Sequence, residues 1–172
     1  MRDQTPVTIL IPAAQVPEGQ TPPMIAADHD ALLASDDPRL RANKQLCYDM
    51  YRTLLQAGRA DRVREFIGPH YIQHNPNVVS GAAALEEFIR NSRPERPIED
   101  RIALPLTAIV AERDMVTFVF VRQEKDEAGD TYYTSWFDVF RVENGLIVEH
   151  WDPAMKSAEM LKLDPNKKRI DP

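Results

Sequence analysis

Hydrophobic residues in the first half of the chain recur at the three- and four-residue spacing of amphipathic helices. The widest apolar stripe covers residues 38–58, where Asp36 or Asp37 can cap the first turn and Gly58 can end the helix. The same spacing predicts shorter helices at residues 25–34, 61–67 and 82–91. Residues 71–74 interrupt this pattern and are expected to be extended, because a proline follows at position 76.

After Pro97 the spacing of apolar residues changes to two, which is typical of strands. Runs rich in β-branched and aromatic residues predict strands at 98–112, 115–125, 131–142 and 146–151. Pro105 lies inside the first run and predicts an edge strand or a bulge there. Helices followed by a meander of mostly antiparallel strands indicate an α+β domain, in which the sheet and the helices can close around a cavity.

Length and composition argue against several classes of function. The 172 residues are 43% hydrophobic, which suits a single domain, and the formal net charge is 21 − 27 = −6. This acidic balance argues against nucleic-acid binding, which needs clustered Lys and Arg. A single cysteine, Cys47, excludes an internal disulfide framework and a multi-cysteine zinc site. No apolar run approaches the roughly 20 residues that span a bilayer, so no membrane insertion is expected.

The two ends of the chain differ from its middle. Residues 1–24 form a proline-rich arm, residues 25–155 form the domain, and residues 156–172 form a charged tail. The arm is predicted to be an extended segment on a surface or a disordered leader. It lacks the basic start and the long apolar stretch of a secretory signal. The compartment therefore stays open: cytoplasmic, or exported after removal of a signal.

The alternation in residues 131–142 places one carboxylate among aromatic residues. Asp138 shares a face with Trp136 and Phe140. A carboxylate on such a face loses hydration, which makes it a candidate general acid or base near neutral pH. The structural alternative is that Arg141 or another cation pairs with Asp138.

His150 is the second candidate, and its position depends on the turn before it. A two-residue Asn144–Gly145 turn would pair Val142 with Ile147 and place Asp138 opposite Trp151. A three-residue loop with a glycine bulge would place Asp138 opposite His150, and we favour this pairing because it leaves Glu149 outward. The choice matters because a shift of one residue inverts both faces.

His74 is the third candidate, since an imidazole can donate and accept protons at neutral pH. Its structural alternative is a side chain that ties the helices to the sheet. A metal site of His74, His150 and Asp152 is the less favoured interpretation. Cys47 lies on an apolar helix stripe and is expected in the core. The sequence has no glycine-rich phosphate loop, so no nucleotide cofactor is expected. It has no HExxH motif and its acidic clusters lack a regular ligand spacing, so no metal is expected either.

Two motifs carry a resemblance to a known family. Tyr-Ile-Gln-His-Asn-Pro at 71–76 and Trp-Phe-Asp-Val-Phe-Arg-Val-Glu-Asn-Gly-Leu-Ile-Val-Glu-His-Trp-Asp at 136–152 resemble the SnoaL-like polyketide cyclases of the nuclear-transport-factor-two-like superfamily. The resemblance covers about residues 38–155. It implies a cone-shaped barrel with a cofactor-free cavity, often dimeric through its sheet. It also implies an acid/base role for Asp138 in aldol condensation, while His74 and His150 match two signatures of the family.

The leading hypothesis is a cofactor-free acid/base enzyme for a small, apolar, carbonyl-containing molecule. Asp138 would remove a proton next to the carbonyl, and His74 or His150 would assist at the oxygen, in an aldol condensation or cyclisation, an isomerisation or a dehydration. Substrate contacts are expected from Tyr51, Tyr71, Asn75, Trp136, Phe140 and Trp151. The alternatives are a non-catalytic module that binds a small ligand and a dimeric interaction module with a filled cavity.

Overall fold

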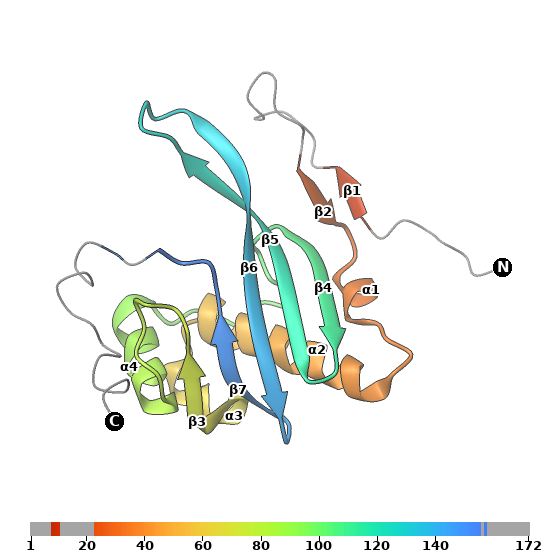
Figure 1. The fold of residues 1–172 in the computed structure, drawn as a ribbon, viewed down its shortest axis with the longest axis vertical. Helices are drawn as coiled ribbons and strands as arrows, with labels where there is room; N and C mark the ends of the chain where they lie inside the picture. Colours follow the sequence, from red (N-terminus) through yellow and green to blue (C-terminus); the bar gives the residue numbers. More distant parts are fainter. Residues whose placement is uncertain (1–7, 11–22, 156, 158–172) are drawn as a thin grey trace.

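The computed structural model describes residues 8–10, 23–155 and 157 (Figure 1). Its helical segments are α1 (His29–Leu33), α2 (Pro38–Met50), the π-helical η1 (Tyr51–Gln56), the 3-10 turn η2 (Ala60–Arg62), α3 (Val63–Phe66) and α4 (Ala82–Ser92). Its strands are β1 (Thr8–Leu10), β2 (Met24–Ala26), β3 (Ile67–Gln73), β4 (Leu106–Glu112), β5 (Met115–Lys125), β6 (Thr131–Glu143) and β7 (Leu146–Trp151).

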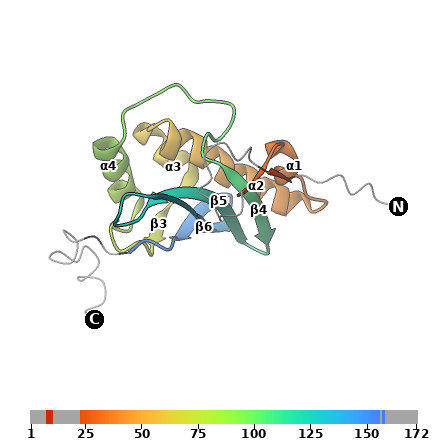
Figure 2. The same ribbon diagram turned by 90° about the horizontal axis from the view of Figure 1, so that it is seen from above.

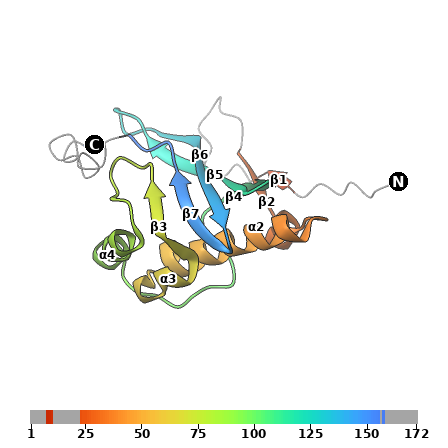
Figure 3. The same ribbon diagram turned by 60° about the horizontal axis from the view of Figure 1, so that its bottom comes forward.

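Five strands form the main sheet in the order β3–β7–β6–β5–β4. Neighbouring strands are antiparallel except β3, which runs parallel to β7. The helices lie along one side of the curved sheet (Figure 2). At one edge, β3 lies beside β7, and α4 lies next to β3 (Figure 3). The predicted α+β class is therefore confirmed.

The core lies between the helices and the inner face of the sheet. Phe118 and Phe140 from neighbouring strands are almost fully buried, with their rings edge to face and 5.7 Å between centroids. Tyr51 of η1 stacks on Phe118 from the helical side, at 6.1 Å. Cys47 is buried in the same core, and burial raises the pKa of its thiol well above the usual range. This residue is a core side chain, as predicted, and not a nucleophile.

The β6–β7 hairpin combines the two turn geometries considered from the sequence. Asn144 and Gly145 both have positive φ and form the tight two-residue turn, which pairs Val142 with Ile147. A register shift follows at once, so that Phe140 pairs with His150. The favoured pairing, with a three-residue loop and Asp138 directly opposite His150, is therefore wrong. The bulge at Val148 still brings His150 to the inner face, because residues across a ladder share a face.

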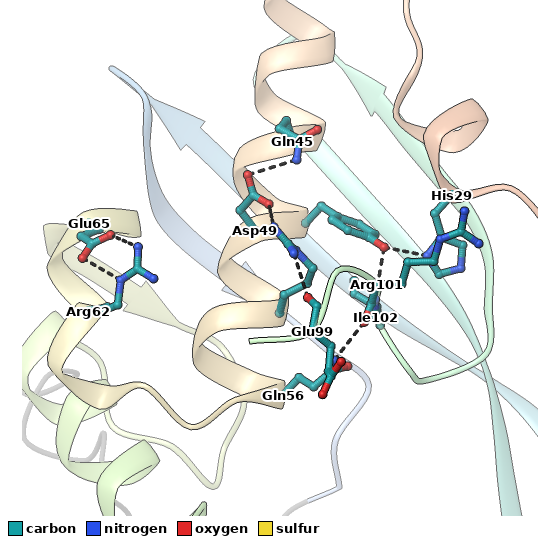
Figure 4. A network of polar contacts seen from close by, with 11 residues as sticks. His29, Gln45, Asp49, Gln56, Arg62, Glu65, Glu99, Arg101 and Ile102 are labelled. Carbon is teal, nitrogen blue, oxygen red and sulfur yellow. Dashed lines mark hydrogen bonds and ion pairs between the residues drawn. The ribbon is translucent and has the colours of Figure 1, made fainter. Parts of the chain in front are cut away.

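The segment 93–105 between α4 and β4 is irregular but firmly attached to the helices (Figure 4). The Arg52 guanidinium donates to the carbonyl of Glu99 (2.8 Å), and the Tyr48 hydroxyl accepts from the amide of Ile102 (3.1 Å). Gln56 binds the backbone of this segment twice, through the carbonyl of Arg101 (2.9 Å) and the amide of Ala103 (2.8 Å). These bonds fix the segment that borders the cavity described below.

Four elements differ from the sequence prediction. The extended segment predicted at 71–74 is a strand that begins at Ile67, and the helix predicted over 38–58 continues beyond Met50 as the π-helical η1. The helix predicted from residue 25 begins only at α1, because Met24–Ala26 pairs with β1 and the Asp28 carboxylate caps the helix after it. The strand predicted from residue 98 begins at Leu106, since Pro105 cannot donate to a ladder. Pro105 does precede an edge strand with a register shift, as predicted.

The predicted arm and tail fall largely outside the described residues. Of the arm, the structure describes residues 8–10, 23 and 24, and of the tail it describes Ser157. Among all described residues, no helix is both long and apolar enough to cross a bilayer.

Candidate functional site

A cavity of about 240 Å³ lies between the inner face of the sheet and the helices. Its walls come from η1, β3, α4, β6, β7 and the residues that follow them. Most of the wall is apolar, and its polar and titratable members are Tyr51, Tyr71, Gln73, Asn75, Arg93, Trp136, Asp138, His150 and Asp152. Such a cavity, with a few convergent polar groups, is typical of small-molecule sites.

Asp138 lies at the centre of this wall, as the alternation of β6 predicts, and is 5% exposed. One oxygen, Oδ1, accepts from the indole N–H of Trp136 (3.1 Å) and lies 3.3 Å from Nε2 of His150. The other oxygen, Oδ2, has no hydrogen-bond partner within the described chain. The alternative of a pairing with Arg141 does not hold, because that guanidinium binds Glu149 and Glu143. Asp138 therefore has one oxygen tied to its neighbours and one available to a ligand.

Gln73 determines which nitrogen of His150 carries a proton. The backbone amide of Asn75 donates to Oε1 of Gln73 (2.9 Å), which fixes this atom as the oxygen. The Gln73 amide nitrogen donates to the hydroxyl of Tyr71 (3.0 Å), in agreement with that assignment. His150 Nδ1 lies 2.9 Å from the same Oε1, which only accepts. Nδ1 is therefore protonated and donates to Gln73.

A hydrogen bond between His150 and Asp138 then needs a second proton, in addition to the one on Nδ1 of His150. With Nδ1 protonated, Nε2 of a neutral imidazole has only a lone pair to offer the carboxylate oxygen 3.3 Å away. A hydrogen bond forms when one proton lies between them, either on His150 as imidazolium or on Asp138 as carboxylic acid. The cavity thus holds a carboxylate and an imidazole side by side, the two side-chain types most often used in acid/base chemistry.

Two tyrosines complete the polar wall. Burial, followed by the charges of Asp152 and Asp138, raises the pKa of Tyr71. Burial and the charge of Asp138 raise the pKa of Tyr51, while Arg93 acts in the opposite direction. The Tyr51 hydroxyl has no hydrogen-bond partner among the described residues, and it stays a neutral O–H donor at physiological pH. It is placed to donate to an oxygen of a bound molecule.

Asp152 directly follows β7 and lies close to Asp138 and His150. Its Oδ2 accepts from the Asn75 side chain (2.7 Å), and Asp138, His150 and Asp152 each present a ligand atom within 4.8 Å of the others. Two carboxylates and an imidazole could hold a divalent cation. His74, which the metal interpretation of the sequence included, is not part of this cluster.

His74 and Trp151 lie on the other face of the sheet. Their rings stack with centroids 4.7 Å apart, and His74 Nε2 lies 2.8 Å from Glu149. Burial disfavours the charged form of Glu149, but hydrogen bonds with His74 and Arg141 outweigh it and lower the pKa of this carboxyl. Neither ring borders the cavity, whereas Tyr51, Tyr71, Asn75, Trp136 and Phe140 all do. The structure thus brings together Asp138, His150 and five of the six expected contact residues.

A second, more open hollow of about 590 Å³ shares Tyr51 and Trp136 with the cavity. The guanidinium of Arg122 lies 4.2 Å from the Trp136 ring and also pairs with Glu124. No carboxylate or imidazole lines this outer hollow, whereas Asp138, His150 and Asp152 line the inner cavity.

The model of the SnoaL-like domain family matches residues 48–150, and the chain belongs to this family. The described part of the chain is an α+β domain with a five-stranded, mostly antiparallel sheet. No curated protein matches the chain.

Several solved structures are similar to the chain. TsrD from Streptomyces laurentii is 24% identical over 69% of this chain and 90% of its own, with a TM-score of 0.41. A candidate polyketide cyclase from Acidithiobacillus ferrooxidans is 17% identical over 69% and 89%, with a TM-score of 0.48. An epoxide hydrolase from M. tuberculosis is 16% identical over 67% and 84%, with a TM-score of 0.48.

Proposed function

We propose that this chain is an acid/base enzyme that acts, without a metal or nucleotide cofactor, on a small apolar molecule containing a carbonyl group. The observation that carries the proposal is the 3.3 Å contact between Oδ1 of Asp138 and Nε2 of His150, while Oδ2 of Asp138 has no partner among the described residues and borders a largely apolar cavity. The tyrosine hydroxyl of Tyr51 supplies a donor on the helical side of the same cavity. A base and a donor on different walls suit proton removal next to a carbonyl.

The steps follow from these positions. Oδ2 of Asp138 takes a proton from the carbon next to the carbonyl, so that a C–H bond breaks and an O–H bond forms. The electron pair moves to the carbonyl oxygen, where the Tyr51 hydroxyl donates a hydrogen bond. Asp138 loses its negative charge when it takes up this proton, and His150, which contacts Oδ1, compensates that change. Returning the proton at another carbon gives isomerisation, and attack of the enolate on a second carbonyl gives aldol condensation or cyclisation. Dehydration follows when the C–O bond to a β-hydroxyl group breaks and the hydroxyl leaves as water with the proton that Asp138 took from carbon.

The first step can be tested without knowing the natural substrate. Protein in D₂O is mixed with acetophenone, 1-indanone or 2-tetralone, and loss of the α-proton signal is followed by proton NMR. We expect exchange with at least one ketone that exceeds the buffer rate and saturates with ketone concentration. EDTA should leave the rate unchanged, whereas a loss of activity restored by a divalent cation would transfer the chemistry to a metal held by the Asp138, His150 and Asp152 cluster.

The alternative function is a binding module of the same fold. Ketones that bind to the protein but exchange no faster than in buffer would support this alternative and refute the enzyme. A protein that binds none of them would favour the third hypothesis, a dimeric interaction module.

We also propose that the protein is a homodimer that pairs through the outer face of the sheet. This face exposes apolar side chains from three strands, since Val110 is 57%, Phe137 44% and Ile72 37% exposed. Single exposed apolar residues are common, but several on the same face of one sheet suit an interface. The two copies would bury these side chains against each other.

A homodimer can be recognised by its mass in solution. Light scattering on the eluting protein should give about twice the 19.6 kDa of one chain. Phe137→Glu should give the mass of a single chain, because burying the new carboxylate at an interface is unfavourable. Val79→Glu, at an exposed valine outside the sheet, is the control and should stay dimeric. A wild-type protein that elutes as a monomer at high concentration would refute the dimer.

A further inference from the structure

Arg93 occupies a fixed place at the border of the cavity. It follows directly after α4 and begins the irregular segment that leads to β4. Gly58 has a φ of +67°, and a Cβ there would meet the carbonyl oxygen of Pro94 at 2.7 Å, so the segment packs directly on backbone. The amide of Arg96 also donates to the carbonyl of Ala57 (2.8 Å). These contacts hold the Arg93 backbone close to the end of η1.

The guanidinium of Arg93 has no acidic partner within the described chain. Arg90, one turn earlier, pairs with Glu86 at 2.6 Å, and Arg52 pairs with Asp49 at 2.6 Å. Arg93 instead borders the cavity, and it is the only Lys or Arg among the described residues that does so. Its positive charge also acts on the hydroxyl of Tyr51, where it opposes the effect of burial on the pKa. A solvent-exposed cation without an acidic partner among the described residues therefore lies at the border of the cavity, near Tyr51.

The cavity is thus electrically asymmetric. Asp138 and Asp152 lie on the side of the sheet, and Arg93 lies with Tyr51 on the side of the helices. A neutral ketone would use the base and the tyrosine donor but leave the guanidinium unmatched. A molecule with a carboxylate near its carbonyl would match all three groups. Guanidinium and carboxylate form paired, charge-assisted hydrogen bonds, which are stronger than neutral ones.

We propose that Arg93 binds a carboxylate of the substrate, so that the substrate class is a keto acid with an apolar body. This inference rests on the proposed function, because the position of the keto group is taken from Asp138 and Tyr51. It makes Arg93 a specificity-determining residue that binds substrate and takes no part in proton transfer. The two carboxylates on the sheet side would repel the acid group and thereby favour one orientation in the cavity.

The test compares 4-oxo-4-phenylbutanoate with its methyl ester, which removes the charge and keeps the ketone and the ring. Binding is followed by tryptophan fluorescence, because Trp136 borders the cavity. We expect the acid to bind about tenfold tighter than the ester, with an advantage that falls as salt is raised. Arg93→Gln should remove that advantage and leave ester binding within about twofold, since only the charge-assisted contact is lost.

The matched control is Arg90→Gln, which removes the same charge from the last turn of α4, three residues before Arg93, at a residue that does not border the cavity. It should leave acid and ester binding unchanged. Equal affinity of acid and ester in the wild type, or an equal effect of both substitutions, would overturn the assignment of Arg93. Competition by inorganic phosphate as strong as that by the keto acid would also overturn it, in favour of a general anion site. Exchange of neutral ketones tests the proposed function separately, so either can fail alone.

Discussion

Asp138→Asn is expected to lower the rate of α-proton exchange by at least about 100-fold, the lower end of what a positioned general base contributes. The amide cannot take up a proton from carbon. Trp136 and His150 both meet Oδ1, so an amide oxygen at that position keeps the bond from Trp136 and keeps the contact with His150 only when Nε2 carries a proton. The melting temperature should therefore stay within a few degrees of the wild type, as measured by circular dichroism on the same samples.

Glu143→Gln serves as the control for this prediction. It makes the same chemical change on the same strand, at an exposed residue that does not border the cavity. It should exchange ketones at the wild-type rate. If Asp138→Asn also keeps that rate, Asp138 is not the base and the mechanism proposed above fails.

Gln73→Leu is expected to have the second largest effect, because it removes three hydrogen bonds from a buried cluster. His150 Nδ1 and the amide of Asn75 lose their acceptor, and the hydroxyl of Tyr71 loses its donor. A buried polar group left without a partner costs about 1–3 kcal/mol, so three of them predict a loss of stability of roughly 3 kcal/mol or more, measured by unfolding in urea. The exchange rate should fall about tenfold or more, because His150 is no longer held in one tautomer.

Gln73→Glu separates positioning from stability. A carboxylate at this position still accepts from His150 and from the amide of Asn75, and Tyr71 can donate to it. We expect it to recover most of the exchange activity that Gln73→Leu loses. Nitrogen NMR of the wild-type imidazoles gives an independent measurement: the His150 spectrum should show a protonated Nδ1. A neutral tautomer with the proton on Nε2 would contradict the role of Gln73.

The sequence predicts the position of Asp138 well, because β6 is long and its alternation has no interruption. The same rule applied to residues 71–74 would have separated Tyr71 and Gln73, which face the cavity, from Ile72 and His74, which do not. The motif at residues 71–76 made the imidazole of His74 the candidate, instead of the side-chain amide of Gln73. A glutamine has no chemistry of its own, and its importance comes from contacts with His150 and Asn75 that only the fold creates.

Other parts of the site depend on contacts across long stretches of chain. Nothing local signals that β3 pairs in parallel with β7, which brings Gln73 next to His150. Arg93 resembles any other charged residue at the end of a helix until the packing of its segment on Gly58 is known. The bulge at Val148 is equally silent in the sequence, since the Asn144–Gly145 turn alone predicts regular pairing.

This bulge has a consequence for how such proteins can diversify. A β7 of the same length paired regularly from the Asn144–Gly145 turn would place Glu149 opposite Phe140, where His150 now lies. The pocket would then hold neighbouring acidic groups in place of an imidazole beside Asp138, and with them a different set of reactions. Related domains could thus acquire new chemistry through a slip of the backbone by one position, with every side chain of the hairpin unchanged.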